Sequence, residues 1–199
     1  LEQVLVAGNE RYSDPRVAMP FADLLGKPVR KSEIESAMLS LGDYPGLTSD
    51  AVFAASDTFG ATDLALAVEE QHIDLSASVD NYGTEYTGNG RARATLDWFN
   101  PVGIGDLFSL NVLQTFDPDE GTYGGVSYEV PLNRYDWTLG ASYNRNAYDV
   151  SGNQAEDIGL GGDSSIGALY LRHQLKRTHS FSAGAYTGLS FKEATIDNV

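Results

Sequence analysis

The side chains best suited to chemistry in this sequence are an acidic run and three histidines. The run at 117–120 offers carboxylate oxygens, which Ca²⁺ prefers as ligands, but it lacks the twelve-residue spacing of a calcium-binding loop. His72, His173 and His179 show no metal-ligand spacing. A solvated acidic loop is the better interpretation of the run, and the sequence predicts no metal site and no cofactor.

Catalytic motifs give no support to an enzyme. The sequence contains no Gly-x-Ser-x-Gly elbow, no phosphate-binding Gly-x-x-x-x-Gly-Lys and no dinucleotide fingerprint after a strand. Ser180 follows His179, but adjacent residues of a strand point to opposite faces, so the pair does not have the geometry of nucleophile and base. The absence of cysteine excludes a thiolate nucleophile and disulfides. We therefore predict that the protein is not an enzyme and has no catalytic residue.

The charge balance narrows the possible partners. With 13 Lys+Arg against 28 Asp+Glu, the chain of 199 residues has a formal net charge of −15. Nucleic-acid binding requires a basic face, so nucleic acid is not an expected partner. No stretch of 18 apolar residues is present, which excludes a transmembrane helix, whereas a transmembrane β-barrel needs only alternating strands of about 9–11 residues.

Residues 1–71 combine strand and helix patterns. Apolar runs predict strands at 4–6, 51–55 and 63–69. A first helix is expected from Asp14 to Leu25, because Ser13 is a capping residue and Pro15 suits a first turn, although Pro20 bends or shortens it.

A second helix is expected from Ser32, where Ser32 and Glu35 form a capping box. Its apolar stripe has helical spacing and comprises Ile34, Ala37, Met38 and Leu41. The order β-α-α-β-β predicts an α+β domain over 1–71, with helices on one face of a small sheet.

From residue 72 to 199 nearly every segment alternates with period two. Apolar residues at 73, 75, 77 and 79 alternate with polar ones, and four further segments do the same. The runs 166–175 and 181–191 look like two further strands with weaker alternation. About seven antiparallel strands are expected, joined by connections of alternating length, with aromatic residues near the strand ends. These features favour membrane-barrel strands. Alternation alone is equally typical of a soluble antiparallel sheet packed on a core.

Five segments resemble one family. The segments 4–13, 32–46 and 60–70 resemble the second polypeptide-transport-associated (POTRA) domain of two-partner secretion transporters, the haemolysin secretion/activation family. The segments 79–88 and 100–106 look like that family's first barrel hairpin and first periplasmic turn. The resemblance implies a POTRA domain over 1–71, in the periplasm, followed by the N-terminal part of a transmembrane barrel over 72–199 in the bacterial outer membrane.

The resemblance also implies a function and its partners. Such a transporter captures an unfolded exoprotein in the periplasm and secretes it through its barrel, with outer-membrane lipid around it. The family's plug helix and first POTRA domain would precede Leu1, about nine of its sixteen strands would follow Val199, and its Val-Arg-Gly-Phe/Tyr motif is not in this sequence. Two alternatives remain open, an assembly factor that inserts outer-membrane proteins and a passive porin or adhesin.

The expected client-binding surface is the strand at 51–55, beside the second helix. An extended client pairs its backbone with an exposed sheet edge, and its alternate side chains enter apolar positions. The expected residues are Val52, Phe53, Ala54, Ile34 and Met38. The competing interpretation is that these apolar side chains only pack the core.

The polar rows of the predicted strands suggest a hydrated pore lining of both signs. The expected pore-lining residues are Asp74, Asp80, Arg91, Arg93, Asp97 and Glu129. The competing interpretation is that these side chains only solvate a wall and form cross-strand pairs.

Overall fold

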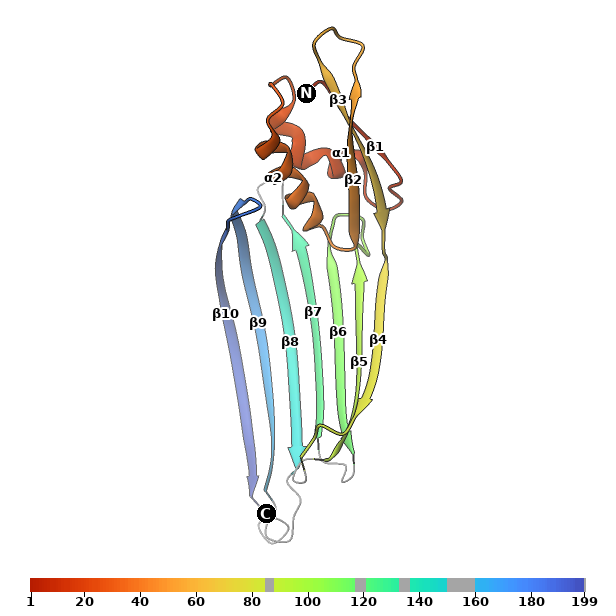
Figure 1. Ribbon diagram of the computed structural model, residues 1–199. Coiled ribbons are helices and arrows are strands. Elements are labelled where there is room, and N and C mark those ends of the chain that lie inside the picture. The colour runs from red at the N-terminus through yellow and green to blue at the C-terminus, as the bar shows by residue number, and fades with distance from the viewer. Residues whose placement is uncertain (85–87, 117–120, 133–136, 150–159, 199) are drawn as a thin grey trace.

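The computed structural model describes residues 1–84, 88–116, 121–132, 137–149 and 160–198. A small sheet with helices lies at one end of a long seven-stranded sheet, and the C-terminus lies at the opposite end (Figure 1). The small sheet ends at Glu70 and the long sheet begins at Ile73. We refer to residues 1–70 as the α+β region. Among the described residues, no helix is both long and apolar enough to cross a membrane.

The α+β region follows the order strand, helix, helix, strand, strand. Its strands pair in the order β1-β3-β2, with β1 parallel and β2 antiparallel to β3. The elements are β1 (Val4–Ala7), α1 (Asp14–Ala18), the 3₁₀ helix η1 (Met19–Leu24), α2 (Lys31–Gly42), β2 (Leu47–Ala55) and β3 (Thr62–Glu70).

The helices begin and end differently from the sequence prediction. The helix expected to run to Leu25 stops at Ala18 and continues as η1, where Pro20 lacks the N–H that an α-helix needs. The capping box was wrong, because α2 begins at Lys31 with Arg30 as N-cap and no side-chain capping bond. Ser32 therefore lies inside the first turn, beside an exposed Lys31–Glu35 pair at 3.6 Å.

The hydrophobic core lies between the small sheet and its helices. Leu64, Leu66 and Val68 occupy alternate positions of β3, and all three are buried on the side that faces the helices. Phe21 from η1 and Leu41 from α2 are buried against them. This two-layer packing gives the α+β region a core independent of the long sheet.

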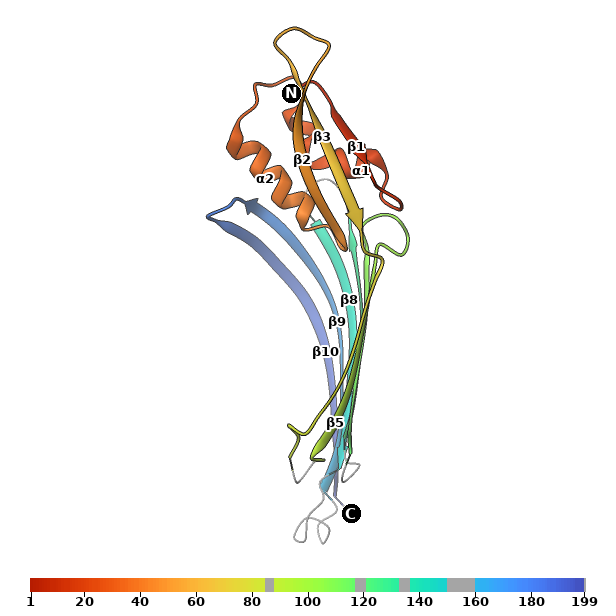
Figure 2. The ribbon, with the colours of Figure 1, turned by 45° about the vertical axis from the view of Figure 1, so that its right-hand side comes forward.

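The long sheet is an antiparallel meander in which each strand pairs with its neighbours along the chain. The strands are β4 (Ile73–Asp80), β5 (Gly90–Phe99), β6 (Leu107–Phe116), β7 (Gly121–Pro131), β8 (Trp137–Asp149), β9 (Leu160–Arg177) and β10 (Ser182–Asn198). The sheet is strongly curved towards β9 and β10 (Figure 2). These last two strands extend beyond the predicted 166–175 and 181–191, because polar and glycine residues continue the backbone pairing where apolar alternation stops.

The register places one row of apolar residues and one adjacent row of mostly small polar residues on opposite faces of the sheet. One row of directly paired residues crosses all seven strands on what we call the apolar face: Ile73, Trp98, Phe108, Tyr128, Ala141, Leu169 and Leu189. The adjacent row belongs to the opposite, polar face: Asp74, Asp97, Ser109, Ser127, Ser142, Ala168 and Ser190.

We expect Leu64→Ala to destabilise the α+β region by about 2–4 kcal/mol, since it empties space in a fully buried position. Native-state hydrogen exchange of the β3 amides measures this loss. Val52→Ala, on the exposed part of the same sheet, is the matched control and should change stability by about 0.5 kcal/mol or less. Equal effects of the two substitutions would contradict the core assignment.

Candidate functional site

The strand β2 is an edge of the small sheet. Among the described strands it pairs only with β3, so its other side presents backbone donors and acceptors without a strand partner. Val52 is 66% exposed and Phe53 is 50% exposed. Phe53 lies opposite Leu64, on the helix-facing side, and Val52 lies opposite Ala65, on the other side. Ala54 is exposed as well, so three of the predicted client-binding residues share an accessible edge.

The two predicted residues of α2 lie elsewhere. Ile34 is only 9% exposed and belongs to the core, so it does not lie on the surface beside β2, which corrects its assignment to the client-binding surface. Met38 is half-buried and packs against the same core. Helical spacing of apolar residues marks the helix face that the sheet covers, which explains this outcome.

The six predicted pore-lining residues all lie on the polar face. Asp80 pairs with Arg91 across β4 and β5 at 2.7 Å, and the Ser109 hydroxyl donates to Asp97. Glu129 accepts from Arg172 at 2.7 Å and from the Tyr170 hydroxyl at 2.6 Å. The remaining residues are Asp74, which pairs in register with Asp97, and Arg93, which pairs with Ser78. The face therefore carries both signs, held by cross-strand pairs.

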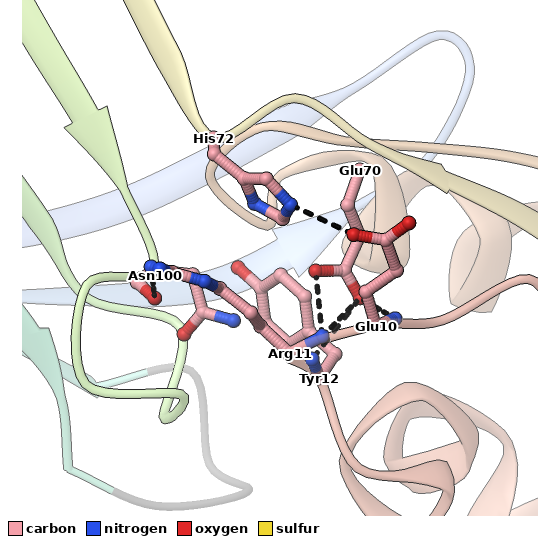
Figure 3. A network of polar contacts seen from close by, with 6 residues as sticks. All are labelled: Glu10, Arg11, Tyr12, Glu70, His72 and Asn100. Carbon is pink, nitrogen blue, oxygen red and sulfur yellow. Dashed lines mark hydrogen bonds and ion pairs between the residues drawn. The ribbon is translucent and has the colours of Figure 1, made fainter.

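A network that sequence reasoning did not find joins the α+β region to the long sheet (Figure 3). The Glu70 carboxylate accepts hydrogen bonds from the backbone N–H groups of Glu10, Arg11 and Tyr12 at 2.9–3.0 Å. The Glu10 carboxylate lies 3.0 Å from Nε2 of His72, in the link between the sheets. A lone Glu at a strand end carries no recognisable sequence signal, because its partners are backbone groups about 60 positions away.

Arg11 extends this network to the turn between β5 and β6. Its Nη1 donates to the Asn100 carbonyl at 3.4 Å. Asn100 has a φ of 51° and is buried, and its side-chain oxygen accepts from the N–H of Gly105 at 2.7 Å. Asp106 accepts from the Val102 N–H and from the Tyr128 hydroxyl at 2.6 Å. Buried polar groups thus fix the turn against which the α+β region rests.

Tyr12 adds a buried contact inside the α+β region. Its hydroxyl donates to the Pro45 carbonyl at 3.0 Å. Burial raises the pKa of Tyr12 well above its ordinary value, so the phenol remains protonated and keeps this donor. The bond ties the loop before α1 to the loop after α2.

A second junction lies at the hairpin between β9 and β10. The Ser36 hydroxyl of α2 donates to the Arg177 carbonyl. The Arg177 guanidinium makes two bonds of 2.9 Å to the two carboxylate oxygens of Asp43. This bidentate geometry is the most directional arrangement available to an arginine and a carboxylate.

Between the two junctions lies a cavity of about 410 Å³. We call it the junction cavity. The α+β region contributes Arg16, Asp43 and Tyr44 to its lining. The polar face contributes Glu129 and Arg172, so this face continues up to the α+β region.

The acidic run at 117–120 lies outside the described residues. Within the described part of the chain, no group of three or more histidine, aspartate or glutamate side chains could hold a metal ion.

The chain matches a known protein family over more than half of its length. The sequence profile of the haemolysin secretion/activation protein family ShlB/FhaC/HecB matches residues 60–196. The chain belongs to this family. The match includes β3 and all seven strands of the long sheet up to residue 196.

Two relatives of this chain carry names that describe them as transporters. The chain is 27% identical over 169 residues to the heme/hemopexin transporter protein HuxB of Haemophilus influenzae (strain 86-028NP), covering 84% of the chain and 29% of the relative. It is 26% identical over 144 residues to the hemolysin transporter protein ShlB of Serratia marcescens, covering 69% of the chain and 25% of the relative. The chain thus spans less than a third of either relative.

Solved structures show the same fold. CdiB from Escherichia coli matches with a TM-score of 0.78 at 20% identity, over 99% of this chain and 37% of that one. BamA from Haemophilus ducreyi lacking POTRA domains 1–3 matches with a TM-score of 0.64 at 16% identity, over 99% of this chain and 36% of that one. The long sheet therefore resembles part of the barrels in these proteins.

We expect Glu70→Ala to free the loop at 10–12, because three backbone N–H groups lose their common acceptor. Water can replace part of this bonding at a partly exposed site, so the local cost should be about 1 kcal/mol. Hydrogen exchange of the amides of residues 10–12 measures it. Glu69→Ala, at the exposed neighbouring position, is the control. Unchanged exchange in the Glu70 variant would show that the carboxylate does not hold the loop.

Proposed function

We propose that this chain is part of an outer-membrane translocator that captures an unfolded exoprotein in the periplasm and secretes it through a β-barrel. Residues 1–71 would form the second POTRA domain, on the periplasmic side, and residues 72–199 the N-terminal part of the barrel. Membership of the haemolysin secretion/activation family supports this function, as do relatives named as transporters.

The observation that carries the membrane assignment is the uncovered apolar face of the long sheet. Leu75 on β4 is 70% exposed and Leu189 on β10 is 69% exposed, and no second layer of the described chain packs on these rows. A soluble sheet would bury its apolar side against a core. Acyl chains around the barrel would cover this face, and the polar face would line a hydrated duct.

The unpaired edges of β4 and β10 support a larger barrel. In the described part of the chain each of these strands has a single neighbour. Open edges in hydrocarbon leave backbone groups unsatisfied at a cost of several kcal/mol each. Further strands of the complete transporter would close the sheet, and the seven strands alone would form no pore.

Client capture would occur at β2. Its unpaired edge offers main-chain bonds to an extended polypeptide, and Val52 and Phe53 offer apolar contact on the two sides of the strand. This surface lies in the α+β region, before the client reaches the polar face.

The alternatives receive less support. An assembly factor shares the fold, as the match to BamA illustrates, but the family profile and the named relatives favour secretion. A passive porin or adhesin has no need for the α+β region and its bonded junctions to the sheet.

The membrane assignment predicts a difference between the two faces of β7. Val126→Lys places a charge at the strand centre on the apolar face, in register with Leu110. It should destabilise the complete barrel in lipid vesicles by about 2–4 kcal/mol, whereas Ser127→Lys on the polar face should cost far less. Urea unfolding followed by tryptophan fluorescence measures both. Equal costs for the two variants would contradict a lipid-facing apolar row.

Client capture predicts that a proline in β2 weakens binding. Alternate amides of an edge strand point away from its partner, so one of Phe53→Pro and Ala54→Pro removes an outward donor and the other disrupts the pairing with β3. The variant that retains a native circular-dichroism spectrum should bind an unfolded exoprotein client about tenfold more weakly. Wild-type affinity in that folded variant would exclude strand addition at β2.

A further inference from the structure

Arg16 is a cation that lines the junction cavity and takes no part in the two junctions. It lies in α1, and its guanidinium stacks over the Tyr44 ring at 5.3 Å from the centroid. Within the described chain, its Nε is buried without a hydrogen-bond partner, and its Nη1 makes a 3.9 Å contact with the Met19 sulfur. None of the ion pairs among the described residues includes Arg16.

Among the described residues, the other charged side chains that line the junction cavity are paired: Asp43 binds Arg177, and Glu129 binds Arg172. In this described lining, Arg16 is therefore an unpaired positive charge, in a protein whose net charge is −15. Arg16 is half-buried, and its buried Nε lacks a partner. A carboxylate is the best partner for a guanidinium, because the planar donors match the two oxygens.

We propose that the junction cavity binds an aspartate or glutamate side chain of the translocating polypeptide through Arg16. This inference rests on the proposed secretion function. A volume of about 410 Å³ accommodates a few residues of an extended chain but no folded domain. Because its walls come from both the α+β region and the polar face, a polypeptide that moves from one to the other lies against Arg16 and Tyr44.

The test measures binding of two fluorescein-labelled peptides to the complete transporter in detergent micelles. Both are twelve-residue Gly/Ser peptides, one with three aspartates and the other with three asparagines. By fluorescence anisotropy the wild type should bind the aspartate peptide at least about tenfold more tightly. Arg16→Gln should abolish this preference, and Arg16→Lys, which keeps the charge but not the planar donors, should retain part of it. Arg30→Gln is the matched control, because Arg30 is exposed and paired with Glu33 outside the cavity.

Three results would overturn the inference. The first is an unchanged preference in Arg16→Gln. The second is equal loss in Arg16→Lys and Arg16→Gln, which would show that Arg16 acts only by packing on Tyr44. The third is displacement of the aspartate peptide by sodium acetate at equal concentration, which would identify a site for free small anions instead of a polypeptide.

A secretion assay with the exoprotein client separates this inference from the proposed function. Secretion by the wild type, together with an unchanged peptide preference in Arg16→Gln, overturns the carboxylate site and leaves the translocator standing. Absence of secretion by the wild type overturns the translocator itself.

Discussion

The structure depends on the cross-strand register of the long sheet. Because side chains alternate along a strand, a slip of one residue between two strands would place polar residues in the apolar row. The pairing from Ile73 on β4 to Leu189 on β10 shows no such slip. The register does shift between Ala183 and Gly184, near the α+β end, and from Ala185 onward the pairing is regular again. The apolar row and the adjacent polar row therefore remain on opposite faces across all seven strands.

The junctions connect this sheet to the part that would receive the client. Arg11 bonds one side of the α+β region to the turn between β5 and β6, while Glu70 holds the Arg11 backbone in place. Arg177 with Asp43 holds α2 to the hairpin between β9 and β10. Attachment at two separate places restricts rotation of the α+β region over the end of the sheet. The junction cavity lies between these attachments, where the polar face begins.

The sequence predicted the strands of the long sheet better than the helix start and the surface residues of the α+β region. The alternation in residues 72–199 predicted seven strands and the polar row, since backbone pairing of a meander needs only neighbouring segments. The capping box at Ser32 matched a motif but not the backbone, because Arg30 already has the extended conformation that begins the helix. Ile34 was assigned to a surface and lies in the core, as its helical spacing with Ala37 and Leu41 allows. Arg16 and Glu70 had no motif at all.

The sequence by itself determined which side chains share a face, because the periods of strand and helix are local properties of the backbone. It also determined the excess of acid. Only the tertiary structure decided which carboxylates and arginines become partners, since Asp43 and Arg177 are 134 positions apart. Such contacts depend on how the two sheets are placed against each other, and no local sequence pattern predicts that placement.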